Sequence, residues 1–471
     1  MSAADGPEAL YQELDRAKLS RKHWLTVLTA GMGFFTDAYD LFIIGTVTAI
    51  LVPLWHLTPV QLSVLNSTSL LASVFGAVLL GKLTDRLGRK AIYGVEVAIL
   101  TLGALLSAFS MSFLQLVIFR FILGFGVGGD YATSAVITGE YANRQDRGRM
   151  IGTVFAMQGF GLLAGPLVAA VLLGAGVPHE LAWRLMLGLG ALPAASVIYL
   201  RRKIKETPRF TLGVRGDVAA TAETVAWVTG QRVQEQTARP TAAARRSRRN
   251  LLDSPYLRRL IGTAGCWLLM DVAFYGNGVS SQIILKALQP HATLLTNIII
   301  AGLIFLIAAV PGYWVAVALM DRIGRRWIQW QGFLVMALAY GVIALVPDVV
   351  KVPLLFLVIY GISYFFIEFG PNQTTFVYPA EVFPVQERGL GFGISAASGK
   401  TGAFIAAFAM PLVVASSGLR GAMGVLAVVS LVGIVLTLWA LPEPARLSLE
   451  EAAAEVPVSM DRREELVGTR A

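Results

Sequence analysis

The chain contains the segment Gly81-Lys82-Leu83-Thr84-Asp85-Arg86-Leu87-Gly88-Arg89-Lys90 and a close copy of it, Ala318-Leu319-Met320-Asp321-Arg322-Ile323-Gly324-Arg325-Arg326. Each copy follows the second long apolar run of one half of the chain. Each places an acid at a helix end, followed by a tight glycine turn and a basic cluster that can bind carboxylates or helix C-terminal carbonyls nearby. A loop that only sets membrane orientation would not need the same pattern twice. The repeat therefore predicts two similar halves, an architecture typical of transporters.

The composition is typical of a membrane protein. Of the 471 residues, 55% are hydrophobic and 15% are charged, and the mean hydropathy is +0.65. The core of a soluble protein needs far less apolar surface than this. Most of the apolar surface of this chain is therefore expected to face lipid. A spanning helix needs about 20 mainly apolar residues. Runs of this kind lie near 24–52, 61–82, 91–112, 114–141, 149–175, 182–200, 260–286, 293–319, 328–346, 353–379, 390–415 and 419–441. We therefore predict an all-α polytopic membrane protein with twelve transmembrane helices in two pseudo-symmetric six-helix halves.

Loop charge predicts the orientation and the domain limits. Lys and Arg gather after the second, fourth, eighth and tenth runs, so the positive-inside rule places both termini and the central linker in the cytoplasm. The expected segments are a cytoplasmic N-terminal segment at 1–22, an N-terminal half at 23–200, a basic linker at 201–257, a C-terminal half at 258–441 and a cytoplasmic C-terminal tail at 442–471. Within the linker lie the basic runs 201–203 and 245–249, and the stretch 218–229 could form a short helix.

These features predict a multi-pass protein of the plasma membrane or of a bacterial inner membrane. It is expected to contact membrane lipids and to function as a monomer. The basic loops also account for the formal net charge of +9, so a nucleic-acid partner is not expected.

Neither a cofactor nor an enzymatic activity is expected. The single cysteine, Cys266, allows no disulfide framework or cysteine-based metal site, and the histidines show no metal-ligand spacing. The glycines of 124–129 have the spacing of a dinucleotide fingerprint, but no strand precedes them and close helix packing explains them better. No set of nucleophile, base and oxyanion donor is visible.

Charged residues interrupt the apolar runs at Asp37, Asp40, Asp130, Asp271, Glu368 and Lys400. A charge at that depth costs at least about 2.5 kcal/mol and is usually functional. Acids in separate helices indicate a path for protons, and a lone lysine among them indicates a bound anion. The pattern predicts a proton-coupled transporter.

Several motifs resemble those of one family. The repeated loops resemble the signature of the major facilitator superfamily, and Gly124-Phe125-Gly126-Val127-Gly128-Gly129-Asp130-Tyr131 resembles the fourth-helix signature of its phosphate:proton symporters. That family includes fungal, plant and some bacterial phosphate permeases. The segments 267–275, 369–372 and 395–400 match it too, and the likeness covers nearly all twelve runs. It implies symport of inorganic phosphate with protons by alternating access of the two halves.

The resemblance also implies a substrate site between the halves. Its positions are Tyr131, Gln158, Trp267, Asp271, Tyr275, Asn372 and Lys400. Hydroxyl, indole and carboxamide groups are neutral donors for a desolvated anion, and Lys400 adds positive charge unless it extends to the interface. Asp271 and Tyr275 are four residues apart and share a helix face. Asp271 is expected to bind in its protonated form, because a carboxylate would repel the anion.

The expected proton-coupling acids are Asp37, Asp40, Asp130 and Asp271. By resemblance, Asp37 and Asp130 match carboxylates associated with proton movement. Asp40 shares a helix face with Asp37, but it could instead cap a broken helix or pair with Arg120. Glu368 stands where that family commonly has a neutral residue, and no role is assigned to it.

Gating is expected from salt bridges between the repeated loops and neighbouring helix ends. The candidates are Asp85, Arg86, Arg89, Glu140, Arg147, Asp321, Arg322, Arg325, Glu381 and Arg388. Glu140 and Glu381 lie near the ends of the fourth and tenth runs, so we assign them to gating and not to the substrate.

Other functions stay open at this point. The segment Asp37-Ala38-Tyr39-Asp40 also resembles the first-helix motif of aromatic-acid porters, so the substrate could be an organic anion. A sugar is a further alternative, but an uncharged substrate would not explain the lysine at position 400. A membrane nutrient sensor is less favoured, because the linker and tails provide no long folded cytoplasmic domain.

Overall fold

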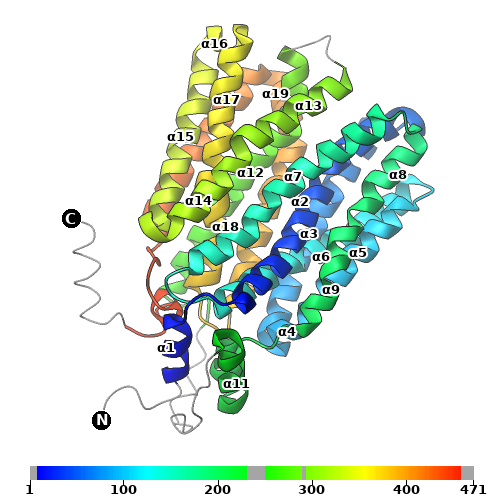
Figure 1. Ribbon diagram of the computed structural model, residues 1–471. Helices are drawn as coiled ribbons and strands as arrows, with labels where there is room; N and C mark the ends of the chain where they lie inside the picture. The colour runs from blue at the N-terminus through cyan, green and yellow to red at the C-terminus, as the bar shows by residue number, and fades with distance from the viewer. Residues whose placement is uncertain (1–7, 231–249, 289–292, 458–471) are drawn as a thin grey trace.

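The protein is all-helical. The computed structural model describes residues 8–230, 250–288 and 293–457, except for the side chains of 8, 277–288, 294, 297, 411 and 415, and within those ranges the chain forms helices and loops without strands. Eleven helical stretches there are long and apolar enough to cross a membrane. The 33-residue helix α12 (Tyr256–Leu288) holds the place of the seventh span. These helices lie side by side in one tall bundle (Figure 1), which confirms the predicted fold class.

The elements follow the order of the apolar runs. The first half contains α2 (Arg21–Trp55), α3 (Pro59–Leu87), α4 (Arg89–Ile92), α5 (Val95–Ala108), α6 (Phe113–Tyr141), α7 (Arg147–Gly174), α8 (His179–Leu189) and α9 (Ala191–Lys203). After α12, the second half contains α13 (Leu294–Ile304), η3 (Phe305–Ala309), α14 (Val310–Ile323), α15 (Arg325–Leu345), α16 (Pro347–Lys351), α17 (Pro353–Ile367), η4 (Glu368–Asn372), α18 (Gln373–Val382) and α19 (Arg388–Ala440). Four short helices lie outside the two halves, namely α1 (Glu8–Arg16), α10 (Pro208–Gly213), α11 (Val218–Thr229) and α20 (Leu449–Ala452).

Two backbone breaks divide the helices of the second half. Gly370, in the π-helical turn η4, leaves the helical angles with φ −100° and ψ −115°. Pro371 follows and has no N–H to continue the helix, as expected at this proline. Glu368 and Asn372 lie on either side of the break, and both are buried. In α19, Gly418 has φ +68°, a left-handed conformation that favours glycine, and the last two spans meet there.

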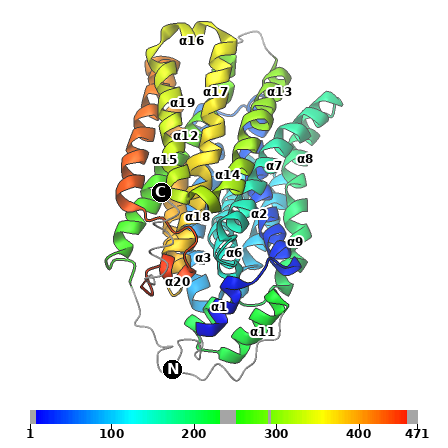
Figure 2. The same cartoon turned by 60° about the vertical axis from the view of Figure 1, so that its left-hand side comes forward.

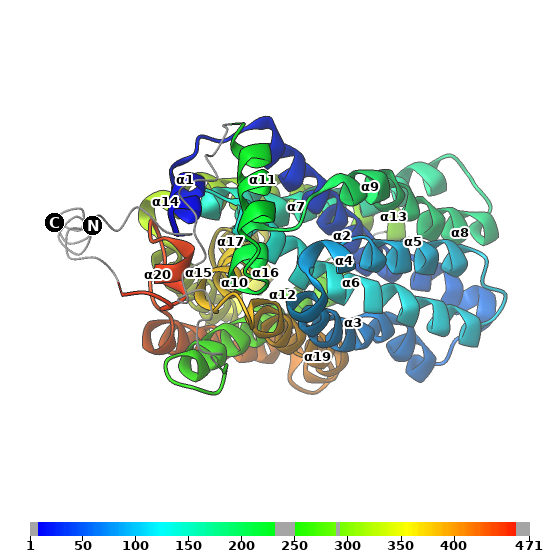
Figure 3. The same ribbon diagram turned by 90° about the horizontal axis from the view of Figure 1, so that it is seen from below.

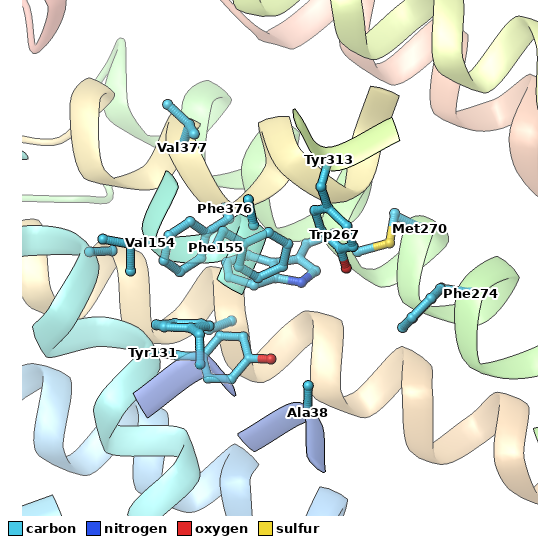
Figure 4. Packing of buried hydrophobic residues seen from close by; sticks show 14 of the residues in the cluster. Ala38, Tyr131, Val154, Phe155, Trp267, Met270, Phe274, Tyr313, Phe376 and Val377 are labelled. Carbon is cyan, nitrogen blue, oxygen red and sulfur yellow. The ribbon is translucent and has the colours of Figure 1, made fainter. Parts of the chain in front are cut away.

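Aromatic side chains fill the centre between the two halves (Figure 4). Phe155 of α7 stacks on Phe376 of α18 with ring centroids 4.5 Å apart. Tyr131 of α6 lies 6.1 Å from Trp267 of α12, again measured between centroids. All four rings are buried. Because each pair joins one half to the other, this cluster closes the centre of the molecule.

Glycine allows the helices of the first half to pack closely. A Cβ atom at Gly128 on α6 would overlap the carbonyl oxygen of Ser73 on α3. Only a residue without a side chain fits there. The close packing expected of the glycine-rich run 124–129 is confirmed.

A belt of short helices, α1, α10 and α20, joins the chain ends to the linker at one end of the bundle (Figures 2 and 3). Arg209 of α10 is buried at its centre. Its guanidinium binds Asp15 of α1 at 2.7 Å and Glu450 of α20 at 2.9 Å. The belt therefore holds three distant parts of the sequence together through one cation.

Helix α9 extends into the segment that the sequence assigns to the linker. Helix α9 continues to Lys203, and Arg201, which we expected in a solvated basic run, is only 1% exposed. The physical reason is that two buried carboxylates, described below, bind its guanidinium. Helix α11 coincides with the predicted short helix. The basic run 245–249 and the end segments 1–7 and 458–471 lie outside the described residues.

Candidate functional site

A buried lysine lies where the two halves meet. Lys400 of α19 donates hydrogen bonds to the hydroxyls of Tyr131 on α6 and Tyr275 on α12, each at 3.2 Å. Its Nζ lies 3.6 Å from Oδ2 of Asp271 on α12. Lys400 is 3% exposed, so it does not extend to an interface. A buried charge is stable only when paired and hydrogen-bonded, and these three groups provide that environment.

Glycine explains how α19 comes this close to α12. A Cβ atom at Gly399 would overlap the indole ring of Trp267, and one at Gly402 would overlap the carbonyl oxygen of Leu268. The two glycines flank Lys400 and let its backbone lie directly against α12. Trp267 packs against Tyr131 across the interface between the halves, so its ring forms one wall of the site.

A second polar cluster joins the halves beside the first. Asn372 of η4 donates to the hydroxyl of Tyr313 on α14 at 2.9 Å, and this hydroxyl donates to Oε1 of Gln158 on α7 at 3.2 Å. Asn372 also donates to Oε2 of Glu368. Sequence reasoning missed Tyr313, because a tyrosine in an apolar run is usually a packing residue. The structure thus groups the seven predicted substrate positions around two clusters and an aromatic wall.

A cavity of 330 Å³ opens beside Tyr275. It is lined by parts of α2, α3, α7, α12, α13, η3 and α19. Phe42 of α2 also lines it and stacks on Tyr275 with centroids 5.6 Å apart. On α3 the cavity touches the first half of the helix, at Leu62, Asn66 and Leu70, and not the end that carries Asp85. The cavity therefore lies between the site and the end of the bundle that is opposite the repeated loops.

The predicted proton-coupling acid Asp130 is held by an arginine. Arg201 binds its carboxylate through two contacts of 2.7 and 3.1 Å, and Ser134 donates to it at 2.6 Å. Arg201 also lies 3.2 Å from Glu96 on α5. A Cβ atom at Gly33 on α2 would overlap Oδ2 of Asp130, so glycine makes room for the pair. Sequence reasoning missed Glu96 and Arg201, although Glu96 interrupts an apolar run as plainly as the other acids.

Asp37 and Asp40 have different surroundings. Both carboxylates are fully buried, and in the described ranges none of their four oxygens has a hydrogen-bond partner. Arg120 lies close to Asp40, but it donates to the backbone carbonyl at 2.8 Å and not to the carboxylate. Arg120 therefore does contact Asp40, as one alternative predicted, but through the backbone carbonyl and not through the carboxylate.

The repeated loops form two matching clusters, here called the latches. In the first latch, Glu140 of α6 binds Arg89 of its own half at 3.0 Å and Arg388 of the other half at 2.7 Å. In the second, Glu381 binds Arg325 of its own half at 2.8 Å and Arg147 of the other at 2.7 Å. These carboxylates and guanidiniums are buried. Each latch thus closes one half upon the other.

The acid of each loop caps a helix of the opposite half. Asp85 accepts hydrogen bonds from the backbone N–H groups of Gly389 and Leu390, at 3.0 and 2.7 Å, where α19 begins. Asp321 accepts from Gly148 and Arg149, at 3.1 and 2.7 Å, where α7 begins. A carboxylate at a helix N-terminus satisfies free amides and interacts favourably with the helix dipole.

Two gating candidates lie outside these clusters. Arg86 and Arg322 are exposed, and the described part of the chain gives neither of them an ion pair. The reason is their position, because each follows the capping aspartate by one residue and so points away from the helix that the aspartate caps.

Known proteins are similar to this chain over almost its full length. The family described as sugar (and other) transporter matches residues 14–455. Inorganic phosphate transporter 1-6 of Oryza sativa subsp. japonica is 36% identical over 506 residues, which cover 94% of this chain and 94% of that protein. Low affinity inorganic phosphate transporter 8 of Medicago truncatula is also 36% identical and covers 94% of this chain and 92% of its own length.

Solved structures share the fold. The major facilitator superfamily proton:xylose symporter XylE, bound to 6-bromo-6-deoxy-D-glucose, has a TM-score of 0.78 and 18% sequence identity, and the match covers 92% of this chain and 98% of that one. At this identity the likeness concerns the fold alone.

Proposed function

The chain belongs to the sugar (and other) transporter family within the major facilitator superfamily, and we propose on that basis that it transports inorganic phosphate together with protons. As a member of this family it is a membrane transporter and not an enzyme. The similarity to plant phosphate transporters over more than nine-tenths of the chain supports phosphate as the substrate. An aromatic acid or a sugar is less favoured.

The observation that carries the proposal is the environment of Lys400. Charge-assisted hydrogen bonds are about 2.7–2.9 Å long, whereas Lys400 and Asp271 are 3.6 Å apart. This loose pair leaves the lysine available to a small anion. Tyr131 and Tyr275 already point hydroxyls at it and can share those groups with phosphate oxygens.

Coupling follows from competition for that lysine. When Asp271 carries a proton, it no longer competes with phosphate for Lys400. When the proton leaves, the carboxylate attracts Lys400 again and repels the anion. Phosphate and the proton therefore bind together and leave together, which is symport.

We assign the first-half acids to proton movement. Arg201 compensates the charge of Asp130 through two contacts. Asp37 has no such partner among the described residues, which favours Asp37 as the acid that carries the proton. Arg201 also lies beside Glu96, so its guanidinium could move from Asp130 to Glu96. Such a movement would couple the charge of Asp130 to that of Glu96.

The transport cycle we propose is a rocking of two halves, residues 23–200 and 258–441, about the site. The latches close one end while the cavity lies toward the other. We place the latches, the linker and both termini on the cytoplasmic side of a plasma membrane or bacterial inner membrane, because the basic residues gather there. A monomer contains both halves and is sufficient for this cycle.

Uptake by reconstituted protein tests the proposal. The full-length chain is placed in liposomes, and labelled phosphate is measured with and without an inward proton gradient. Phosphate should accumulate only with the gradient, and arsenate should compete while xylose and benzoate do not. Competition by benzoate or xylose alone, or no entry of phosphate, would contradict it.

The variant Asp271→Asn tests the coupling step. Asparagine is permanently neutral, so it cannot alternate between freeing and recapturing Lys400. Phosphate should still exchange across the membrane at equal pH, but accumulation driven by the proton gradient should be lost. The exposed variant Asp348→Asn is the control and should behave as the unmodified protein. Concentrative uptake by Asp271→Asn at the normal level would rule out this role.

A further inference from the structure

Glu368 is a buried acid that the cycle above does not use. Its side chain is fully buried at the first position of η4, next to the break at Gly370. One carboxylate oxygen, Oε2, accepts from Asn372, while Oε1 has no hydrogen-bond partner in the described ranges. Each unsatisfied buried polar atom costs free energy, so a buried acid in this position indicates a functional role.

The groups around Glu368 provide no positive charge. The titratable side chains that face it are Tyr313 from α14, Tyr364 from α17 and Asp271 from α12. Lys400, the nearby cation of the site, is engaged with Asp271 and the two tyrosines. No ion pair of the described residues includes Glu368. An ionised Glu368 therefore has only neutral groups beside it to stabilise its charge, the amide of Asn372 and the hydroxyl of Tyr313.

That amide is fully occupied in this arrangement. The Nδ2 group of Asn372 has two hydrogens, and it donates to both Glu368 and Tyr313. No amide hydrogen remains for a phosphate oxygen. If Asn372 is to bind phosphate, as expected for this predicted substrate position, one of these hydrogen bonds must be given up.

We propose that Glu368 is a positioning residue that carries a transported proton, and that its protonation releases an amide hydrogen of Asn372 to phosphate. The inference rests on the proposed function and adds a further coupling acid to Asp271 and the first-half acids. The proton occupies a carboxylate oxygen of Glu368 while phosphate is bound, and it passes to water in the compartment where phosphate leaves.

Two physical effects act in the same direction. The proton removes a negative charge that would stand near the bound anion without a cation of its own. It also weakens the acceptor that holds Asn372, so the amide can turn toward phosphate. Each ligand therefore raises the affinity for the other, which is the thermodynamic condition for symport.

The number of protons moved per phosphate tests the inference. Unmodified protein and Glu368→Gln are reconstituted, and the ratio is obtained from the membrane potential at which net phosphate flux reverses under fixed pH and phosphate gradients. Glutamine fills the same space and cannot bind a transported proton. The ratio should fall by one proton per phosphate, while phosphate exchange at equal pH stays within about threefold of the unmodified rate. Glu180→Gln, a surface glutamate paired with Arg184, is the matched control and should leave the ratio unchanged.

The outcomes separate this inference from the proposed function. If unmodified protein moves no phosphate, the proposed function fails. If it moves phosphate and Glu368→Gln keeps the normal ratio, the inference about Glu368 is wrong and the proposed function stands. Loss of exchange as well as accumulation in a folded Glu368→Gln protein would also overturn it, because the carboxyl group would then be needed for binding itself.

A spectroscopic measurement does not depend on transport. Infrared difference spectra on adding phosphate should contain carbonyl bands of protonated carboxylic acids, and one component of these bands should be absent from Glu368→Gln but present in Glu180→Gln, while the component of Asp271 remains in both. The variant Tyr313→Phe, which keeps the acid and removes one acceptor of Asn372, should retain the Glu368 component. Identical spectra from the unmodified protein and Glu368→Gln would exclude the role.

Discussion

Lys400 is the residue on which the proposed substrate site depends most directly. Its ammonium is the cation shared by Tyr131, Tyr275 and Asp271 from both halves. In Lys400→Gln, Asp271 loses its counter-ion and phosphate loses its charged partner. Removing one member of such a buried charge cluster should weaken phosphate binding by about 3 kcal/mol, which is roughly 100-fold.

Binding of labelled phosphate to the purified variant measures this loss. Lys351→Gln, an exposed lysine at the far end of the bundle, is the control and should bind phosphate normally. A normal affinity in Lys400→Gln would remove this lysine from the site.

At the scale of residues, the sequence indicated which charged residues lie in the apolar runs. It did not indicate which side chains these residues contact. Asp271 and Lys400 could be predicted because a charge in an apolar run is conspicuous. Arg201 stood at the apparent end of a run, where basic residues are usually solvated, so nothing in the sequence indicated its contact with Asp130. Tyr313 and Asn372 meet only because two helices pack against each other. Such pairings depend on helix packing, which periodicity does not encode.

At the scale of helices, α2 offers a comparison between two glycines. A Cβ atom at Gly33 would overlap Asp130, whereas one at Gly45 would meet no atom within 4 Å. Gly33→Ala should therefore separate Asp130 from Arg201 and destabilise the folded protein by at least about 3 kcal/mol. Gly45→Ala should stabilise it by about 0.5–1 kcal/mol, since alanine favours a helix.

Unfolding of both variants in the same detergent measures the difference. Because each is a glycine-to-alanine change in the same helix, the helix propensity contributes equally to both. Equal stability of the two variants would show that the space beside Asp130 is not needed.

The latches predict how the helix ends move. Glu381→Gln leaves Arg147 and Arg325 buried without their carboxylate, which should destabilise the closed arrangement by about 3–5 kcal/mol. Spin labels at the exposed positions Arg86 and Arg322, one in each half, should then lie farther apart than in the unmodified protein.

Double electron–electron resonance measures that distance. Glu223→Gln, an exposed glutamate paired with Lys205, should leave it unchanged. An unchanged distance in Glu381→Gln would mean that the latch does not hold the halves together.

At the scale of the whole molecule, the belt connects the chain ends to the first latch. Arg209 binds Asp15 and Glu450 and also donates to the backbone carbonyl of Glu140 at 2.8 Å. Arg209→Gln should leave two acids without a cation and lower stability by about 3–5 kcal/mol, with faster proteolysis of both chain ends. Thermal unfolding and limited proteolysis measure this, and Arg215→Gln, a neighbouring exposed arginine, is the control. Equal rates of cleavage in the two variants would show that Arg209 does not hold the chain ends to the linker.

The molecule as a whole was the most predictable level. Twelve apolar runs and one repeated loop lead to the observed fold, because lipid permits few ways to satisfy the backbone. The same rule that found the spans assigned Arg201 to the basic linker, since it treats every terminal arginine as solvated. Arg201 shows that a basic residue at a helix end can instead belong to the interior.

The two capping aspartates imply that water binds to the protein when the halves separate. Asp85 and Asp321 together hold four backbone amides at the starts of α19 and α7. Separation of the halves at this end would strip all four of their acceptors in one step, and buried amides do not remain unpaired. Water molecules must enter to replace the carboxylates, so hydration is a reactant in the opening step. The rate of opening should therefore fall as osmotic stress lowers the activity of water.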